Sequence, residues 1–280
     1  MRILVLGGGG FVGGALLRRL AGHELVVPSR APARLKAAGL PGSFPPFRED
    51  LAALVEEVRP EAVVNLLGII KEEAGETFEK VHFEYTRRLA AGASRAGVRR
   101  FVQMSALGAD PASRSRYQAS KGRAEAWLAS SGLEHTVFRP SLITGPGQRL
   151  FADLARLARV LPFLAAPADA WAAPVNVEDV ADCFAKAVLE GLPAGLYELA
   201  GEERLDYAEL FRRGLAAAGA PRRPVIGVPK AVFLPLLPLF SLLPSPPLTA
   251  DQYRMLAAPN VPSGRYPGVA EILGGVRPAF

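Results

Sequence analysis

Thiol and imidazole groups are scarce in this chain of 280 residues. It has one cysteine, Cys183, and three histidines, His23, His82 and His135, at wide intervals. A single cysteine cannot form an intramolecular disulfide or a thiolate metal site, and isolated histidines lack the spacing of a zinc site. We therefore expect neither a disulfide-stabilised scaffold nor a metal centre.

A hydrophobic run long enough to cross a bilayer is also missing. Residues 228–248 form the most apolar segment, but Pro235, Pro238 and other prolines interrupt it, and its unbroken pieces are far shorter than about 20 residues. Two interpretations stay open: a buried connection, which we favour, and an exposed patch that contacts a membrane surface or a partner subunit. The first residues lack the pattern of a secretory signal, so we expect a cytoplasmic protein, with peripheral membrane contact through 228–248 as an alternative.

Hydrophobic residues, in contrast, are abundant, and basic residues exceed acidic ones. Hydrophobic residues make up 50% of the chain, which is enough for a core and excludes a disordered protein. The net charge is +6, yet the arginines are scattered in pairs such as Arg18-Arg19 and Arg99-Arg100 rather than gathered in a run with interleaved aromatics. We therefore expect no nucleic-acid partner, and a phosphorylated cofactor would explain part of the positive charge.

Short apolar runs alternate with segments of helical spacing in the first half of the chain. Expected strands cover residues 3–6, 25–27, 62–67, 100–104 and 135–138, and expected helices cover residues 11–20, 51–58, 78–96 and 121–130. Strands separated by helices run parallel, with right-handed crossovers that place helices on both faces of the sheet. The pattern predicts an α/β fold with a doubly wound parallel sheet, the Rossmann fold, followed by a small C-terminal substrate lobe.

The composition changes after about Gly145, where proline and alanine become more frequent. We expect residues 1–145, with returning segments at about 174–200, to form a dinucleotide-binding domain. Residues 146–173 and 201–280 are expected to form a small, mostly helical lobe that binds substrate or docks on a partner.

A glycine-rich segment lies between the first expected strand and the first expected helix, which is the position of a dinucleotide-binding turn. Gly7 permits the tight turn, Gly10 lets backbone N–H groups approach a pyrophosphate, and Gly13 lets the helix pack close to the strand. The pyrophosphate would rest on the N-terminus of the helix. The residues predicted to bind the cofactor here are Gly7, Gly9, Gly10, Phe11, Val12 and Gly13.

The end of the second expected strand carries no acidic residue that could accept the 2′-hydroxyl of an adenosine ribose. Arg30 and Arg34 follow it instead, and a planar guanidinium can bind a 2′-phosphate through two hydrogen bonds. We therefore predict NADP as the cofactor, with NAD as the alternative, and place Ser29, Arg30 and Arg34 in its site.

Tyr117 and Lys121 are four residues apart, so a helix would place them on one face. A neighbouring ammonium favours the phenolate and lowers the tyrosine pKa toward the working range, which makes the phenol a usable general acid or base. Tyr117 would then exchange a proton with a carbonyl or alcohol oxygen while a nicotinamide exchanges a hydride with the carbon. Lys121 would also bind the nicotinamide ribose.

Together these motifs resemble the short-chain dehydrogenase/reductase superfamily, in its extended and atypical branch. The spacing of the three glycines has that superfamily's form, and Tyr117 with Lys121 matches its Tyr-x-x-x-Lys motif. Asn65-Leu66-Leu67-Gly68 looks like its Asn-x-x-Gly segment, and Arg139-Pro140-Ser141 is similar to the stretch after the next strand. The resemblance implies further cofactor contacts from Asn65, Leu66, Leu67, Gly68, Pro140 and Ser141.

A closer resemblance is to bacterial relatives of the nucleotide-binding accessory subunit of respiratory complex I, which are epimerase/dehydratase-like proteins. The residues that carry it are Phe101 to Asp110, Ser115-Arg116-Tyr117, Pro174 to Ala181, Tyr197 to Gly201 and Leu248-Thr249-Ala250-Asp251-Gln252. This resemblance implies a nucleotide-bound protein that docks on another subunit or a membrane.

The superfamily resemblance also implies a hydroxyl at the end of the fourth expected strand that polarises the substrate oxygen. Ser105 is the candidate, but the superfamily's usual pair of hydroxyls is reduced here to Ser105-Ala106. If the catalytic hydroxyl corresponds to Ala106, the loss is on the order of a hundredfold in rate. His82 stands where the superfamily often has a supporting asparagine, and we interpret it as a helix-face residue.

Three functions are consistent with these residues. The first is an NADP-dependent oxidoreductase that acts on an apolar carbonyl or a quinone-like substrate. The alternative is a catalytically weak, nucleotide-bound structural or assembly protein of the complex I accessory-subunit type. A nucleotide-sugar epimerase or dehydratase ranks last, because only Arg149 and Arg204 offer a clamp for a sugar diphosphate.

Overall fold

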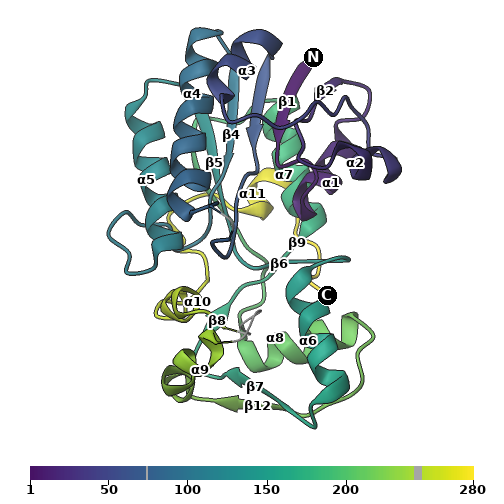
Figure 1. Cartoon of the computed structure of the whole chain (residues 1–280), viewed down its shortest axis with the longest axis vertical. Coiled ribbons are helices and arrows are strands. Elements are labelled where there is room, and N and C mark those ends of the chain that lie inside the picture. Colours follow the sequence, from purple (N-terminus) through teal and green to yellow (C-terminus); the bar gives the residue numbers. More distant parts are fainter. Residues whose placement is uncertain (74, 243–247) are drawn as a thin grey trace.

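A parallel sheet forms the centre of the computed structural model, which describes residues 1–73, 75–242 and 248–280 (Figure 1). Six strands cross the sheet in the order β10, β5, β4, β3, β1, β2. Their bounds are β1 Arg2–Leu6, β2 Glu24–Val26, β3 Ala62–Asn65, β4 Arg100–Met104, β5 His135–Pro140 and β10 Gly195–Leu199. The chain moves from β1 to β2 on one side and then to β3, β4, β5 and β10 on the other, so the predicted doubly wound sheet is confirmed.

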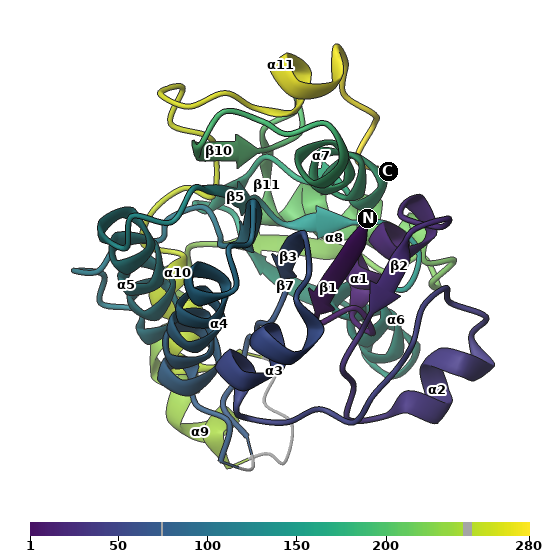
Figure 2. The same cartoon turned by 90° about the horizontal axis from the view of Figure 1, so that it is seen from above.

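Helices cover both faces of this sheet. α1 and α7 pack together on one face, and α3, α4 and α5 lie on the other (Figure 2). Successive residues of β1 alternate between the two cores, which explains why the strand is apolar from Ile3 to Leu6. The helix bounds are α1 Phe11–Arg19, α2 Pro32–Ala37, α3 Leu51–Val58, α4 Tyr85–Arg95, α5 Arg116–Ser130 and α7 Val177–Leu189, with a π-helical turn, η1 Glu79–Glu84, directly before α4.

An extended segment at residues 43–47 continues the sheet beyond β2. The Val27 N–H donates to the Ser43 carbonyl, and the Phe47 N–H donates to the Ser29 carbonyl, each at 2.9 Å. Pro45 lies between them and has no N–H to donate. The sequence pattern does not predict this segment, which brings Phe47 beside the end of β2.

A second group of elements is connected to the carboxyl ends of β5 and β10 and lies beyond one end of the sheet (Figure 1). Here β7 pairs with β12 in parallel and β8 pairs with β11 antiparallel, so this region is less purely helical than expected. Its separate core includes Phe151, Leu154 and Leu210. The bounds are β6 Ile143–Thr144, α6 Arg149–Val160, β7 Leu164–Pro167, β8 Trp171–Ala172, β9 Val175–Asn176, β11 Leu205–Asp206, α8 Tyr207–Ala217, β12 Val225–Val228, η2 Lys230–Leu236, α9 Leu237–Ser241 and α10 Ala250–Met255.

The apolar segment that follows β12 is exposed rather than buried. The exposed fractions of its large side chains reach 61% at Leu239 and 79% at Leu242. The favoured interpretation of a buried connection is therefore wrong for residues 228–242, while residues 243–247 lie outside the described residues. Across the described ranges, no helix is both long enough and apolar enough to cross a membrane.

The last elements return to the sheet. α11, Val269–Leu273, packs against α7, and Val269 and Ile272 are buried in the core on that face. The Arg277 backbone N–H donates to the buried carboxylate of Asp179 at 2.8 Å. The structure thus differs from the expected grouping of all residues 201–280 in the C-terminal lobe.

Candidate functional site

The glycine-rich turn joins β1 to α1 with little space around its backbone. Gly7 has a φ of +77°, and a Cβ added there would lie 2.9 Å from the carbonyl of Leu66. The Gly10 N–H donates to the Gly7 carbonyl at 2.9 Å, which closes the turn. A Cβ at Gly13 would lie 2.5 Å from that same carbonyl oxygen. Glycine at Gly7 and Gly13 is therefore required by close backbone contacts.

The N-terminus of α1 is open to an anion. Gly9 and Gly10 are exposed, Phe11 is half-buried, and Val12 is buried beneath the turn. The first turn of α1 contains no acidic residue, and in the described part of the chain no side chain caps it. Its N–H groups and the positive end of the helix dipole suit a pyrophosphate, so the cradle fits the dinucleotide predicted from the sequence.

The residues after β2 carry two exposed arginines. Arg30 donates to Glu76 at 2.8 Å, and its guanidinium lies over the ring of Phe47, 4.8 Å from the ring centre. Arg34 is exposed on α2, and the Ser29 hydroxyl accepts from the Ala31 N–H. Glu76, which sequence reasoning missed, therefore holds the arginine predicted to read the 2′-phosphate.

The segment after β3 is shaped by a buried amide. The Asn65 side chain accepts from the Leu67 N–H at 3.1 Å and donates to Thr86 and to Gln103. Asn65 is completely buried, and Leu66 lies under the glycine turn. The buried hydrogen bonds of Asn65 thus determine the shape of the predicted Asn-x-x-Gly segment, and the side chain has no exposed surface.

Lys121 connects the ends of β3 and β4. Its Nζ donates to the carbonyls of Met104 at 3.0 Å and Leu67 at 3.5 Å, which uses two of its three N–H donors. A Cβ on the exposed Gly68 would lie 3.5 Å from this ammonium. The side chain is only 3% exposed, and burial lowers its pKa to about 8, against the opposing effect of Glu125.

Tyr117 lies in the first turn of α5, one turn before Lys121. Burial raises the pKa of its phenol to about 12. The structure therefore differs from the expectation of a lowered tyrosine pKa, because desolvation, rather than the charge of Lys121, determines the shift. At physiological pH the phenol holds its proton and can act as a donor.

His82 is completely buried in η1, although the sequence suggested a helix face. Its Nε2 accepts from the Ile69 N–H at 3.1 Å, so its Nδ1 carries the proton and donates to the Ser120 hydroxyl at 2.9 Å. The Ser120 hydroxyl donates to the Tyr117 carbonyl at 2.8 Å. This chain of hydrogen bonds, which could not be predicted from the sequence, holds the loop after β3 against the helix that carries Tyr117.

The same imidazole also supports the tyrosine ring. The rings of His82 and Tyr117 pack edge-to-face with 5.1 Å between their centres. The ring of Phe78 stacks on His82 with 5.6 Å between their centres. Burial, together with the charge of Lys121, lowers the pKa of His82 to about 2. The ring stays neutral, so it positions Tyr117 without exchanging protons at physiological pH.

Ser105 follows β4 directly and sits beside the Met104 carbonyl that Lys121 binds. Its Oγ is buried and has no hydrogen-bond partner in the described part of the chain. An unpaired buried hydroxyl is costly unless a ligand satisfies it. This orphaned donor fits a substrate oxygen, and Ala106 beside it supplies no second hydroxyl.

Pro140 and Ser141 lie at the end of β5. The Pro140 carbonyl accepts from the Leu107 N–H at 3.0 Å, and the Ser141 hydroxyl donates to the Asn260 carbonyl at 3.0 Å. The hydroxyl of Ser141 is therefore already engaged by the C-terminal region, and its predicted contact with a cofactor stays a prediction.

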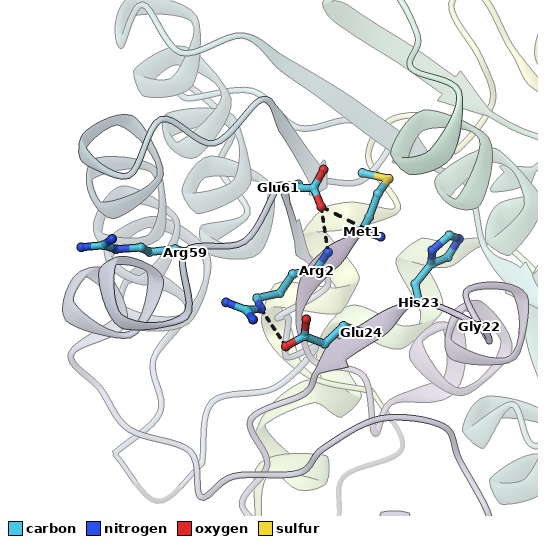
Figure 3. Close-up of a pocket in the computed structure, with 7 residues that line it drawn as sticks. All are labelled: Met1, Arg2, Gly22, His23, Glu24, Arg59 and Glu61. Atoms are coloured by element: carbon cyan, nitrogen blue, oxygen red, sulfur yellow. Dashed lines mark hydrogen bonds and ion pairs between the residues drawn. The ribbon is translucent and has the colours of Figure 1, made fainter.

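A shallow pocket at the amino end of the sheet differs in character from this site. Figure 3 shows Arg2 between Glu24 and Glu61, with His23 and Arg59 further out. The Arg2 side chain donates to Glu24 at 2.7 Å, and its backbone N–H donates to Glu61 at 3.1 Å. Arg2 thus already binds both carboxylates, so we assign no function to this pocket.

The buried ammonium of Lys121 makes stability depend on pH. Its pKa is about 8 in the folded protein against 10.5 ordinarily, so the unfolded chain binds more protons between these values, and stability should rise with pH from about 8 to 10.5. The Lys121→Met variant should lack this rise and be more stable at pH 7, by up to about 3 kcal/mol. Urea unfolding from pH 7 to 10 measures both effects. With the exposed Lys36→Met as control, equal pH slopes in all three proteins would contradict the prediction.

Comparison with known proteins assigns the chain to a family. Residues 3–200 match the model of the NAD dependent epimerase/dehydratase family. The chain belongs to this family. The match covers the whole parallel sheet and the glycine turn, so the resemblance to extended short-chain dehydrogenases/reductases is confirmed.

Three curated relatives are similar over much of the chain. Subunit 9 of the NADH dehydrogenase [ubiquinone] 1 alpha subcomplex of Arabidopsis thaliana is 31% identical over 74% of this chain and 55% of its own length. The 40 kDa subunit of NADH-ubiquinone oxidoreductase of Neurospora crassa is 30% identical over 83% of this chain and 64% of its own. Ceramide reductase of Caulobacter vibrioides is 33% identical over 58% of this chain and 52% of its own. The chain thus spans less than two thirds of each relative.

Solved structures share the fold. The gox2253 protein superposes with a TM-score of 0.75 at 23% identity, covering 99% of this chain and 94% of its own. The UDP-glucose 4-epimerase of Thermus thermophilus, solved with NAD, gives a TM-score of 0.64 at 24% identity, covering 82% and 86%. These similarities confirm the Rossmann-type architecture of this chain.

Proposed function

We propose that this protein is an NADP-dependent oxidoreductase that reduces or oxidises an apolar carbonyl or quinone-like substrate. One observation carries the proposal: a continuous series of contacts leads from the glycine turn through Leu66 and Leu67 to Lys121 and on to Met104. Beside Met104 lies the Ser105 hydroxyl, which has no hydrogen-bond partner among the described residues. These contacts support the proposal because they lie at the carboxyl ends of β1, β3 and β4, where ligands bind in this type of sheet.

When bound, the dinucleotide would supply the hydride chemistry. The chain's own residues handle the proton and the developing charge. In reduction, the protonated phenol of Tyr117 donates its proton to the carbonyl oxygen, and the Ser105 hydroxyl donates a hydrogen bond to the same oxygen. The ammonium of Lys121 favours the phenolate that remains, which solvent then reprotonates. Oxidation of an alcohol runs through the same groups in reverse.

The preference for NADP rests on Arg30 and Arg34 at the end of β2. Arg30 spends one N–H on Glu76, and its other donors can bind a 2′-phosphate. We expect Arg30→Ala to weaken NADPH binding by about 10- to 100-fold and NADH binding by less than about twofold, because a charge-assisted hydrogen bond is lost only with the former. Titration of both dinucleotides measures this. The exposed Arg95→Ala serves as control, and equal losses for both dinucleotides would contradict the prediction.

The apolar character of the substrate is supported by the exposed side chains of residues 228–242 and by the ceramide reductase relative. The same surface supports the proposal of peripheral membrane contact through 228–248. Of that range, residues 243–247 lie outside the described residues.

A second candidate is a nucleotide-bound accessory protein that docks on a partner subunit. Similarity to two subunits of mitochondrial NADH dehydrogenases favours it, as does the single hydroxyl at Ser105-Ala106. A nucleotide-sugar epimerase is supported by the family name alone. Of its two candidate clamp residues, Arg204 already stacks on Trp171 at 4.8 Å.

Kinetics with the purified full chain separate these candidates. NADPH oxidation is followed with a panel of ketones and quinones of increasing chain length, after titration has established that the dinucleotide binds. Stimulation by a carbonyl supports the oxidoreductase, and turnover of a UDP-sugar without net oxidation supports the epimerase. Tight dinucleotide binding with no stimulation by any carbonyl supports the accessory protein and overturns the first proposal.

A further inference from the structure

A carboxylate from the C-terminal region binds the N-terminus of the tyrosine helix. The Asp251 carboxylate accepts from the Arg116 N–H at 2.7 Å, from the Tyr117 N–H at 3.1 Å and from the Ser115 hydroxyl at 2.8 Å. Its side chain is 13% exposed. The partners lie more than 130 residues away in sequence, so this is a tertiary contact between α10 and α5.

The arrangement satisfies the first turn of α5 completely. Ser115 is the N-cap residue, and its Oγ accepts from the Gln118 N–H at 3.3 Å while donating to Asp251. Asp251 takes the two N–H groups that Ser115 cannot reach. A negative charge at this position also faces the positive end of the helix dipole.

Asp251 is itself held in place. α10 begins with a capping box, in which Thr249 accepts from the Gln252 N–H at 3.1 Å and the Gln252 side chain accepts from the Thr249 N–H at 2.9 Å. The capping box therefore stabilises the first turn of α10, which contains Asp251. Asp251 thus joins α10 to the turn of α5 that carries Tyr117.

We propose that Asp251 is a positioning residue for Tyr117: it couples the docking of α10 to the placement of the phenol at the Lys121–Ser105 site. The inference rests on the proposed oxidoreductase function. Because the backbone N–H of Tyr117 itself is bound, loss of the carboxylate shifts the residue that carries the phenol and leaves the glycine turn intact. The effect should therefore fall on kcat and leave dinucleotide affinity unchanged.

The test compares Asp251→Asn and Asp251→Ala with Asp206→Asn in the full chain. Asp206 also caps a helix of the same region, accepting from the Glu209 N–H at 2.8 Å, but it belongs to α8. We expect kcat for the best carbonyl to fall about 10-fold in Asp251→Asn and about 100-fold in Asp251→Ala, with the dinucleotide Kd changed less than about twofold. Asp206→Asn should keep wild-type kcat. If Asp251→Ala fails to fold, the kcat and dinucleotide Kd of Asp251→Asn are sufficient to test the inference.

Amide hydrogen exchange of residues 116 and 117 provides a readout that needs no activity. It should accelerate at least about tenfold in the Asp251 variants and stay at the wild-type rate in Asp206→Asn. If the wild-type protein reduces no carbonyl, the proposed function fails, and these exchange rates still decide whether Asp251 holds the turn. Unchanged exchange, or a loss of kcat no larger than in Asp206→Asn, overturns the inference.

Discussion

Replacing Gly13 with alanine is expected to weaken dinucleotide binding more than 100-fold. The added Cβ would lie 2.5 Å from the Gly7 carbonyl oxygen and 2.6 Å from the Gly8 Cα, and both are backbone atoms that cannot rotate away. The start of α1 must then move off the turn, and the N–H groups that we propose to bind a pyrophosphate move with it. Overpacking of this kind should also lower the free energy of unfolding by about 1–3 kcal/mol.

The neighbouring glycine provides a matched control. A Cβ at Gly14 would have no atom within 4 Å, and its N–H already donates to the Gly10 carbonyl within the helix. Gly14→Ala should therefore bind NADPH as the wild type does and gain up to about 1 kcal/mol in stability from helix propensity. Dinucleotide titration and urea unfolding of both variants measure these effects. Binding by Gly13→Ala at wild-type affinity would show that the turn is not the pyrophosphate site.

The strands and the glycine turn are predictable because their signals are local. β1 is apolar on both faces since each face meets a different layer of helices, and such continuous runs mark a buried parallel strand. The segment at residues 43–47 was missed for an equally local reason. Its prolines remove the signature of a strand, although Ser43 and Phe47 still pair with the chain around Val27 and Ser29.

The residues that support Tyr117 could not be predicted, because their roles arise from distant contacts. His82 has no distinctive neighbours in sequence, and its function depends on Ile69 and Ser120 converging on it. Asp251 stood in a segment that resembled a family motif, but its partners lie in another helix. The pKa of Tyr117 was predicted in the wrong direction for the same reason, since spacing reveals a nearby cation and not the extent of burial.

The Tyr117→Phe variant is expected to lose about 100- to 10,000-fold in the rate of carbonyl reduction, the range for removing a positioned proton donor. The ring contacts with His82 and Phe78 survive the change, so the fold and the dinucleotide affinity should persist. Tyr197→Phe is the control, because its hydroxyl only donates to the Pro193 carbonyl at 2.9 Å and its loss should cost about 1 kcal/mol in stability without affecting kcat.

The pH dependence of reduction identifies the group that assists the phenol. Tyr117 keeps its proton until about pH 12, whereas Lys121 loses its charge near pH 8. We therefore expect the wild-type rate to fall above about pH 8, because the phenolate left after proton donation then lacks the positive charge that we propose Lys121 supplies. The residual rate of Tyr117→Phe should be insensitive to pH in this range, since it forms no phenolate. A wild-type rate that stays constant to pH 10, or a Tyr117→Phe variant as active as Tyr197→Phe, would remove the tyrosine from the chemistry and favour the accessory-protein function.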